Sequence, residues 1–290
     1  MKLWVPILIF VFPSLLSGQF TSDFLISAYE DDVNSSKYFA PVNDAFGSIL
    51  HTGVFPRYSD KGFHIKIGIH ANRIEFTDAI NTYQASIGQG SQEFFVDAPT
   101  VSGDREGAQA SNEQGETINL PGGLGLVTHD LLAPELYIGT LYGTDFYGRY
   151  SNSSLFNKND VLIYFGGGIR HDFGRYFLPE YIKWYLSYNY NLLTFGDFIK
   201  STNQYGMTQL GVELNRIGLY GLFGYEINSM EFAYDGSNPI RSDSFSLSVD
   251  ETTPLRYGGG INLNFKYFEL YGEYNLNDPV NIVVGFSVGI

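Results

Sequence analysis

The sequence has 290 residues, of which 17% are aromatic and 33 are glycine, with no cysteine and a formal net charge of −14. This acidic balance argues against a nucleic-acid partner, because phosphate binding needs a basic surface. The lack of cysteine excludes disulfides, thiolate metal sites and a lipid-modified N-terminal cysteine.

Residues 1–18, MKLWVPILIFVFPSLLSG, predict a signal peptide. Lys2 precedes an apolar run, and the small residues Ser17 and Gly18 offer a cleavage site that leaves Gln19 as the first mature residue. A membrane anchor is the alternative, but the run is short and two prolines interrupt it. No later stretch approaches the ~20 continuous apolar residues of a membrane helix. We therefore expect an exported protein that is periplasmic, secreted, or a barrel in an outer membrane.

Residues 19–61 are predicted to form a helical, plug-like segment ahead of the first strand. Apolar residues recur there at helical spacing, namely Phe39, Val42, Phe46, Ile49 and Leu50. The stretch SDFLISAYEDD (22–32) predicts a further short helix, with Ser22 or Asp23 as its N-cap.

From residue 62 onward the apolar period changes to two, which is typical of strands. In FHIKIGIHA, the apolar side chains of Ile65, Ile67 and Ile69 face one way, and His64 and His70 face the other. The alternation recurs in VLIYFGGGI, KWYLSYNYNLL, YGGGINLNFK, YFELYGEYN and the last ten residues, NIVVGFSVGI. It is weaker in ELYIGTLYG, GMTQLGVELN, GLYGLFGYEIN and SFSLSV. Each strand therefore has one apolar face and one polar or small face.

Many of these strands have the nine to eleven residues that a tilted strand needs to cross a membrane. Connections are tight at 215–218, 266–267 and 275–279, and long at 96–123 and 234–243, as in barrels with one short-turn rim. A final strand that closes against the first removes both sheet edges. We predict that residues 62–290 form an all-β, antiparallel transmembrane β-barrel of about twelve strands, range ten to fourteen. A secreted sandwich or soluble barrel is the alternative.

Three segments, GTDFYGRYS (143–151), GGGIRHDFGRYFLPE (166–180) and YLSYNYNLL (185–193), resemble an uncharacterised family of exported Gram-negative β-barrel proteins. That family carries an aromatic-x-Arg-Tyr strand end, matched by Tyr147, Arg149 and Tyr150. A Gly-rich strand then ends in a basic residue and His-Asp, matched by Arg170 to Asp172, before a proline, matched by Pro179. The resemblance covers about a third of the chain and implies a barrel in the cell outer membrane, with no activity to transfer. A more distant, architectural likeness is to the long-chain fatty-acid transporter barrels, which place an N-terminal helical plug before the first strand.

No catalytic or metal-binding constellation is recognisable. His64 and His70 lie ~20 Å apart along one strand, too far to share a metal, and His171-Asp172 is expected in a turn. Gly-x-Ser-x-Gly and His-Glu-x-x-His are both absent. Asp97, Asp104 and Glu106 do not have the spacing of a calcium loop. We predict no enzyme activity and no cofactor, with a lipid-modifying enzyme of dispersed Ser and His residues as a remote alternative.

The inward faces carry charges of both signs, which predicts either a mutually paired, partly filled interior or a water path. The lumen-lining candidates are Lys66, Arg149, Arg170, Asn189, Asn191, Glu213, Glu226, Asn262, Lys266, Glu269 and Glu273. On architecture alone we expect a channel or transporter for small solutes, hydrophobic ones included. The rival is a non-conducting structural or accessory subunit of a larger outer-membrane complex. The expected partners are accordingly outer-membrane lipid and, for the rival, that complex.

Overall fold

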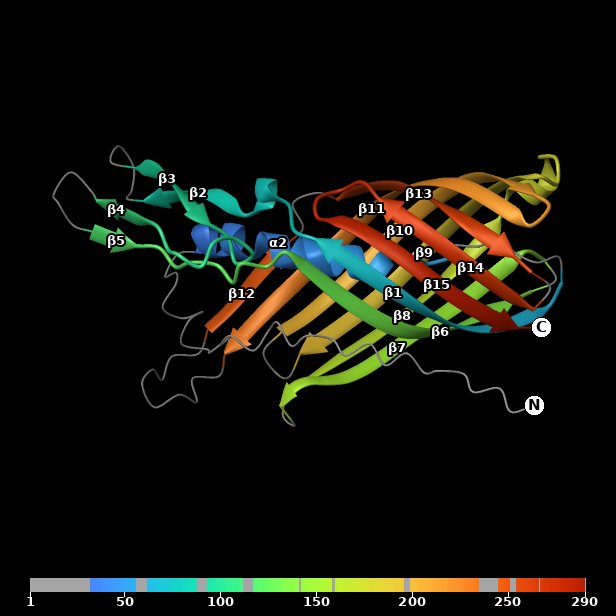
Figure 1. The fold of residues 1–290 in the computed structure, drawn as a ribbon, viewed down its shortest axis with the longest axis horizontal. Helices are drawn as coiled ribbons and strands as arrows, with labels where there is room; N and C mark the ends of the chain where they lie inside the picture. The colour runs from blue at the N-terminus through green and yellow to red at the C-terminus, as the bar shows by residue number, and fades with distance from the viewer. Residues whose placement is uncertain are drawn as a thin grey trace, which may run out of the picture.

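The computed structural model describes residues 32–55, 62–87, 93–111, 117–140, 142–157, 160–195, 199–234, 245–250, 254–265 and 267–289. The predicted signal peptide (1–18) and the predicted short helix up to residue 31 lie outside these residues. The chain forms a closed, antiparallel barrel of ten strands, with one further strand outside it and one N-terminal helix (Figure 1). The expected barrel is therefore present, but the best value of twelve strands is wrong.

Around the ring, most barrel strands pair with the barrel strands that come directly before and after them in the sequence. In ring order they are β1 (His64–Glu75), β6 (Thr128–Gly139), β7 (Thr144–Asn157), β8 (Asp160–Asp172), β9 (Ile182–Phe195), β10 (Ile199–Leu214), β11 (Ile217–Tyr234), β13 (Leu255–Asn264), β14 (Phe268–Asn275) and β15 (Val280–Gly289). The last strand pairs with the first, with Lys66 opposite Gly289, and this ladder closes the ring.

The extra strand, β12 (Phe245–Asp250), accounts for one of the two strands by which the predicted number exceeds the ring. It pairs with the far end of β11, from Ser229 to Tyr234, whereas β13 pairs with the near part of the same edge. The two strands thus share one position in the ring. An alternating sequence identifies a strand, but it does not say which edge the strand occupies.

Alternation along the strands sorts side chains between the lumen and the outside. In β1 the inward His64, His70 and Asn72 are buried, whereas Ile67 and Ile69 are exposed on the outer face. All ten barrel strands expose large apolar side chains in this way, such as Leu136 on β6, Phe223 on β11 and Phe286 on β15. Soluble monomers rarely expose an apolar patch of more than a few hundred Å², and this surface encircles the molecule.

Aromatic side chains border the apolar surface at both ends. On one side are Tyr142, Phe173, Tyr176, Phe177, Tyr181, Phe265 and Tyr267, and on the other are Tyr150, Phe165, Tyr188, Tyr190, Tyr225, Tyr257 and Tyr274. Tyr257 and Phe265 are separated by about 26 Å along the strand at ~3.3 Å per residue. A strand tilt of about 40° reduces this to roughly 20 Å along the barrel axis, near the ~25 Å apolar band of membrane barrels.

The two rims of the barrel differ in their connections. At the terminal rim, where β1 begins and β15 ends, the connections are short: 140–143, 173–181 with the 3-10 helix η3 (Gly174–Tyr176), 215–216 and 265–267. The opposite rim carries the long connections 76–127 and 235–254. It also carries the tight turn at 276–279, which the sequence pattern had grouped with the short-turn rim.

The long connection 76–127 folds into a cap above the second rim, the cap rim. It contains η1 (Asp78–Ile80) and two hairpins, β2 (Thr82–Ile87) with β3 (Phe94–Pro99) and β4 (Gln109–Ser111) with β5 (Thr117–Asn119). β2, β3, β4 and β12 bury an apolar core together with Tyr38, Phe39 and Val42 of the helix. Phe39 packs on Phe232 of β11, with their ring centroids 4.5 Å apart.

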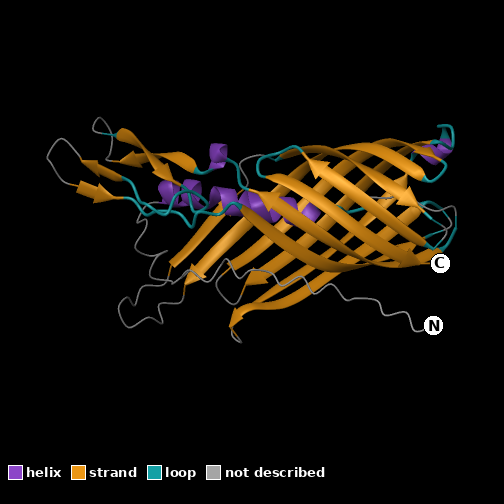
Figure 2. Ribbon diagram, in the orientation of Figure 1, coloured by secondary structure: helices purple, strands orange, loops and turns teal. Residues whose placement is uncertain are grey.

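The helix α2 (Asp32–His51) runs from the cap into the barrel (Figures 1 and 2). Its first half is bound to the cap: Asn34 exchanges hydrogen bonds with the backbone of Ser86, and the Tyr38 hydroxyl donates to the carbonyl of Gly122. Twenty residues span about 30 Å at ~1.5 Å each. Phe55, four residues after the helix, lies beside Tyr137 and Arg170 near the terminal-rim ends of β6 and β8, so the described chain runs through the lumen from the cap rim toward the terminal rim. Within the described residues, no helix is both long and apolar enough to traverse a bilayer.

If the apolar surface faces lipid, a charge placed in the middle of it will destabilise the protein. We expect Leu136→Arg to lower the free energy of unfolding in lipid vesicles by about 2–4 kcal/mol. The matched control is Phe95→Arg, at an exposed apolar position on the cap, where we expect a change within about 0.5 kcal/mol. Urea unfolding followed by tryptophan fluorescence measures both, and equal effects would contradict a lipid-facing band.

Candidate functional site: a plugged lumen

The lumen is occupied by the second half of α2 and the four residues after it. We call residues 32–55 the plug segment. Side chains from β1, β7, β8, β11, β14 and β15 all bond to its lower part, residues 43–55. The lower part of the plug segment is therefore surrounded by the wall.

The wall supplies donors to the carbonyl groups at the C-terminal end of α2. The last four carbonyls of a helix have no partner within the helix and carry partial negative charge. Here Asn72 donates to the carbonyl of Ile49 (3.2 Å) and the Tyr164 hydroxyl donates to that of Leu50 (3.2 Å). Arg149 then donates to the carbonyl of Thr52 (2.8 Å) and also to that of Gly53. A cation at a helix C-terminus is the favourable arrangement.

Arg149 is itself held by a buried carboxylate, Glu135 on β6. The guanidinium lies 3.3 Å from Glu135 Oε2, and both side chains are fully buried. The same carboxylate accepts hydrogen bonds from the hydroxyls of Tyr137 and Tyr271, each at 2.9 Å, and lies 3.5 Å from His70 Nδ1. A buried carboxylate is stable only when its lone pairs are occupied in this way.

Arg170 repeats the arrangement one strand further on. It pairs with Asp145 and donates to the carbonyl of Phe55 (3.2 Å), the last described residue of the plug segment. The guanidinium lies 4.8 Å from the ring centroid of Phe55 and 4.3 Å from that of Tyr185. A desolvated cation between aromatic rings gains cation–π attraction.

A third charge cluster lies beside the helix itself. Glu226 pairs with Arg256 and accepts from Asn203, and His51 Nδ1 of the helix lies 3.4 Å from its Oε1. A Cβ atom on Gly47 would come within 2.2 Å of Glu226 Oε1. Glycine at position 47 therefore permits the helix to approach this carboxylate.

Wall amides and a carboxylate complete the polar contacts of the plug segment. Asn228 donates to the backbone carbonyl of Asn43 (2.8 Å). Asn281 donates to Ser48 Oγ and to Thr52 Oγ1, each at 3.0 Å. The amide of Gly53 donates to Glu273 Oε1 (3.0 Å).

One side of the plug segment makes apolar contact instead. Ala45, Ile49 and Leu50 pack against wall residues on β1, β6, β8 and β9, with Phe46 and Phe76 at the margin. The wall residues of this apolar patch are Ile74, Leu131, Ala133, Tyr164 and Leu193. The patch lies in the half of the lumen toward the cap rim.

The lumen-lining candidates from the sequence occupy several of these clusters. Arg149, Arg170, Glu226 and Glu273 contact the plug segment, and Asn191 bonds to Asn203 beside Glu226. Lys66 pairs with Glu269 (3.2 Å), and Glu213 pairs with Lys183 (3.4 Å) in a partly exposed position, both away from the plug segment. Asn189 donates to the carbonyl of Tyr205, Asn262 is fully buried, and Lys266 lies outside the described residues.

Sequence reasoning missed Glu135, Asp145 and Arg256, the partners of three charges in the lumen. Glu135 lies in the weakly alternating stretch ELYIGTLYG, and Asp145 and Arg256 lie at or next to the ends of predicted strands. The available signal was charge balance, because each inward arginine requires a buried carboxylate.

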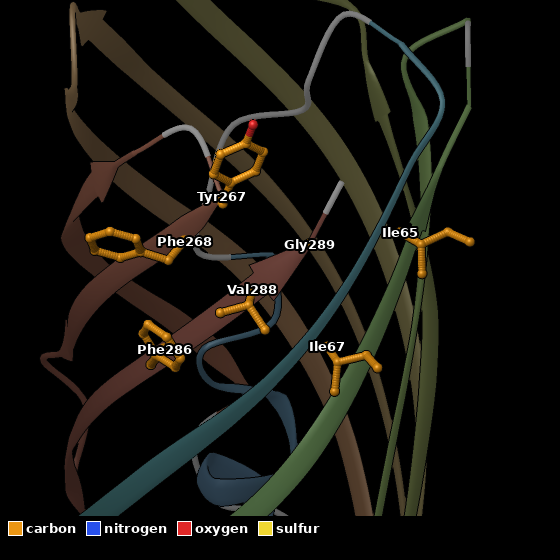
Figure 3. Close-up of a pocket in the computed structure, with 7 residues that line it drawn as sticks. All are labelled: Ile65, Ile67, Tyr267, Phe268, Phe286, Val288 and Gly289. Carbon is orange, nitrogen blue, oxygen red and sulfur yellow. The ribbon is translucent and has the colours of Figure 1, made fainter. Parts of the chain in front are cut away.

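The other candidate sites are a metal site, the His171-Asp172 pair and an apolar pocket. In the described part of the chain, no three His, Cys, Asp or Glu side chains gather as metal ligands. His171, at the end of β8, bonds to Thr144 Oγ1 and to the Tyr176 hydroxyl. An open apolar hollow of about 790 Å³ lies outside the barrel on β1, β14 and β15, where Ile67, Phe268, Phe286 and Val288 point outward (Figure 3). It belongs to the outer apolar surface.

Removing Arg149 leaves Glu135 as an uncompensated buried charge and frees two plug carbonyls. We expect Arg149→Met to destabilise the protein by about 3–5 kcal/mol, measured as the shift in urea midpoint. The control Arg73→Met breaks an exposed ion pair with Asp130 and should cost less than about 1 kcal/mol. The double variant Arg149→Met with Glu135→Gln should recover part of the loss, and no recovery would argue against the pairing.

Gly47 and Gly206 form a second matched pair. We expect Gly47→Ala to be destabilising, because overpacking costs about 1–3 kcal/mol where the new methyl meets Glu226, which Arg256 holds in place. Gly206→Ala meets nothing within 4 Å and should fold as the parent does. Thermal unfolding in detergent compares them, and an unchanged Gly47→Ala would mean that the helix does not sit against Glu226.

Several solved structures of other proteins align with this chain. A toluene transporter, TbuX of Ralstonia pickettii, aligns over 79% of this chain and 90% of its own, with 7% identity and a TM-score of 0.29. The translocator domain of the autotransporter NalP from Neisseria meningitidis aligns over 88% and 97%, with 13% identity and a TM-score of 0.34. Ail, the attachment invasion locus protein of Yersinia pestis, aligns over 79% and 96%, with 12% identity and a TM-score of 0.25.

No curated protein sequence matches the chain. A family model does match, and it spans residues 1–290. By that match, the chain belongs to a family of unknown function, DUF6588.

Proposed function

We propose that this protein is an outer-membrane transport barrel for small solutes whose lumen is closed at rest by its own plug segment. The outer surface supports a membrane location: every strand of the ring exposes apolar side chains, and aromatic residues border them on both sides. In such barrels the short turns are periplasmic and the longer loops extracellular. The terminal rim is then periplasmic, and the cap faces the outside.

The observation that carries the proposal is the way the lumen is filled. An eight-stranded barrel fills its interior with side chains of the wall, whereas a wider barrel has room for something else. Here a helix occupies that room, and the wall holds its lower end by hydrogen bonds from Arg149, Arg170, Asn72 and Asn281. Such contacts can be exchanged for others when the helix shifts, which is what a gate requires. We propose no catalytic role.

The second candidate is the non-conducting accessory subunit. It is favoured by the ion pairs inside the lumen, because Arg149, Arg170, Arg256 and Lys66 each have a carboxylate partner in the closed state. A permanently closed barrel needs such pairing, and so does the resting state of a gated one. Measuring conduction with and without the plug segment separates the two candidates.

We expect the full-length protein to be silent in planar bilayers and the variant lacking residues 32–55 to conduct. Removing the helix opens the lumen along its axis and leaves Arg149 and Arg170 facing water. Heat-dependent gel mobility checks that the deletion variant still forms a barrel.

A tethered variant provides the matched control. Ser48→Cys with Asn281→Cys replaces a 3.0 Å hydrogen bond between helix and wall by a disulfide, in a chain that has no other cysteine. Denaturant at a concentration that spares the barrel should open channels in the parent but not in the oxidised tethered variant. Silence of the folded deletion variant would favour the accessory-subunit candidate.

A further inference from the structure

One ladder in the barrel wall is much shorter than the others. β6 and β7 pair only from Glu135 opposite Arg149 to Gly139 opposite Asp145, which is five pairs. The next shortest ladder in the ring, between β13 and β14, has seven pairs. β6 continues toward the cap rim through residues 128–134 and β7 through residues 150–157, without pairing to each other. The two strands diverge visibly (Figure 1). We call this unpaired stretch the seam.

Pro134 explains where the ladder ends. At the turn, the Thr140 amide donates to the carbonyl of Thr144 on β7. In an antiparallel pair, every second residue directs its backbone groups to the same neighbour, so position 134 on β6 also turns its nitrogen toward β7. Proline has no N–H to donate. Two residues further on, the carbonyl of Leu132 is approached at 3.5 Å by the Ser151 hydroxyl.

The end of the seam nearer the terminal rim lies within the apolar band. Leu132, Pro134 and Tyr150 are all exposed on the outer face. The exposed ion pair of Asp130 on β6 with Arg73 on the neighbouring β1 marks the border of the band. Unpaired backbone groups are costly in hydrocarbon, which is why membrane barrels otherwise pair every strand. The seam is thus a weak line in the wall at the level of the outer leaflet.

Behind the β6 side of the seam the lumen is apolar. The inward side chains of Leu131 and Ala133, on the unpaired part of β6, belong to the apolar patch against Ile49 and Leu50 of the helix. On the other sides, the plug segment meets arginines, amides and carboxylates. On the β6 side, a solute that passes between helix and seam therefore meets apolar side chains. The polar groups beside this path are the Ser151 hydroxyl on β7 and, where the ladder begins, Glu135 and Arg149, which pair with each other.

We infer that the seam is a lateral passage by which small apolar molecules move between the lumen and the bilayer when the helix shifts. This inference rests on the proposed transport function and adds its substrate class and route. A polar solute is disfavoured between helix and seam, because the side chains of the apolar patch cannot replace its hydrogen bonds to water.

Closing the seam with a disulfide tests the route. Continuing the β6–β7 register by two residues places Ala133 opposite Ser151, both on the inner face. The probe is N-phenylnaphthylamine, an apolar dye that fluoresces on entering membranes, added to intact cells that produce the protein. We expect the parent to take up dye faster than cells with an empty vector. Oxidised Ala133→Cys with Ser151→Cys should fall to the vector rate, and reduction should restore the parent rate.

The control disulfide joins Ile138→Cys to Phe146→Cys, a pair inside the existing ladder, and should leave uptake unchanged. Pro134→Val is a second, cysteine-free variant: it restores the missing N–H, extends the ladder and should slow uptake. Parent-like uptake by both the locked variant and Pro134→Val would overturn the seam as the route. Parent uptake no faster than vector would overturn the apolar substrate class, and the conductance of the plug deletion would still decide the proposed function.

Discussion

The guanidinium of Arg149 connects the two parts of this structure, the barrel wall and the plug segment. One side chain donates to the last carbonyls of the helix and pairs with Glu135 in the wall. Burying this charge is costly, and two interactions offset the cost: the ion pair with Glu135 and the hydrogen bonds to carbonyls at the negative end of the helix. Glu135 in turn accepts hydrogen bonds from two tyrosine hydroxyls. The same buried ion pair therefore fixes the position of the helix and requires a polar lumen around it.

The same reasoning accounts for the composition of the inner wall. Tyrosines 137, 164, 205, 220 and 271 fill the space around the helix, and their hydroxyls reach carboxylates or backbone groups where these are available. Glycines such as Gly168 and Gly285 leave room for these rings, since a Cβ there would meet Tyr147 or Tyr271 at less than 2.5 Å. Large side chains thus stand beside glycines, so that the rings fit between the wall and the helix.

Periodicity, strand length and the spacing of short and long connections together predicted the barrel. Periodicity also predicted the helix around Phe39 to Leu50 and put Arg149, Arg170 and Glu226 on inward faces. It did not predict strand neighbours, which depend on contacts far apart in the sequence, so β12 was counted as a separate member of the ring. It also missed Glu135 and Arg256, because a single charge in a weak or terminal stretch has no period of its own. The cap was expected only as a long polar loop. Its hairpins are held by Tyr38 and Phe39 of the helix, contacts that no local pattern reveals.

The passage of the chain from the cap rim to the terminal rim has a consequence for biogenesis. The helix is held at both ends, by the cap through Tyr38 and by the wall through Tyr164 and Arg149. We expect the ring to form around it, with the ladder between β1 and β15 closing after the helix has reached its place. The part of the chain that is made first is then enclosed by the part that is made last. An assembly factor acting on this protein would then have to release β1 and β15 only after the helix lies inside the barrel.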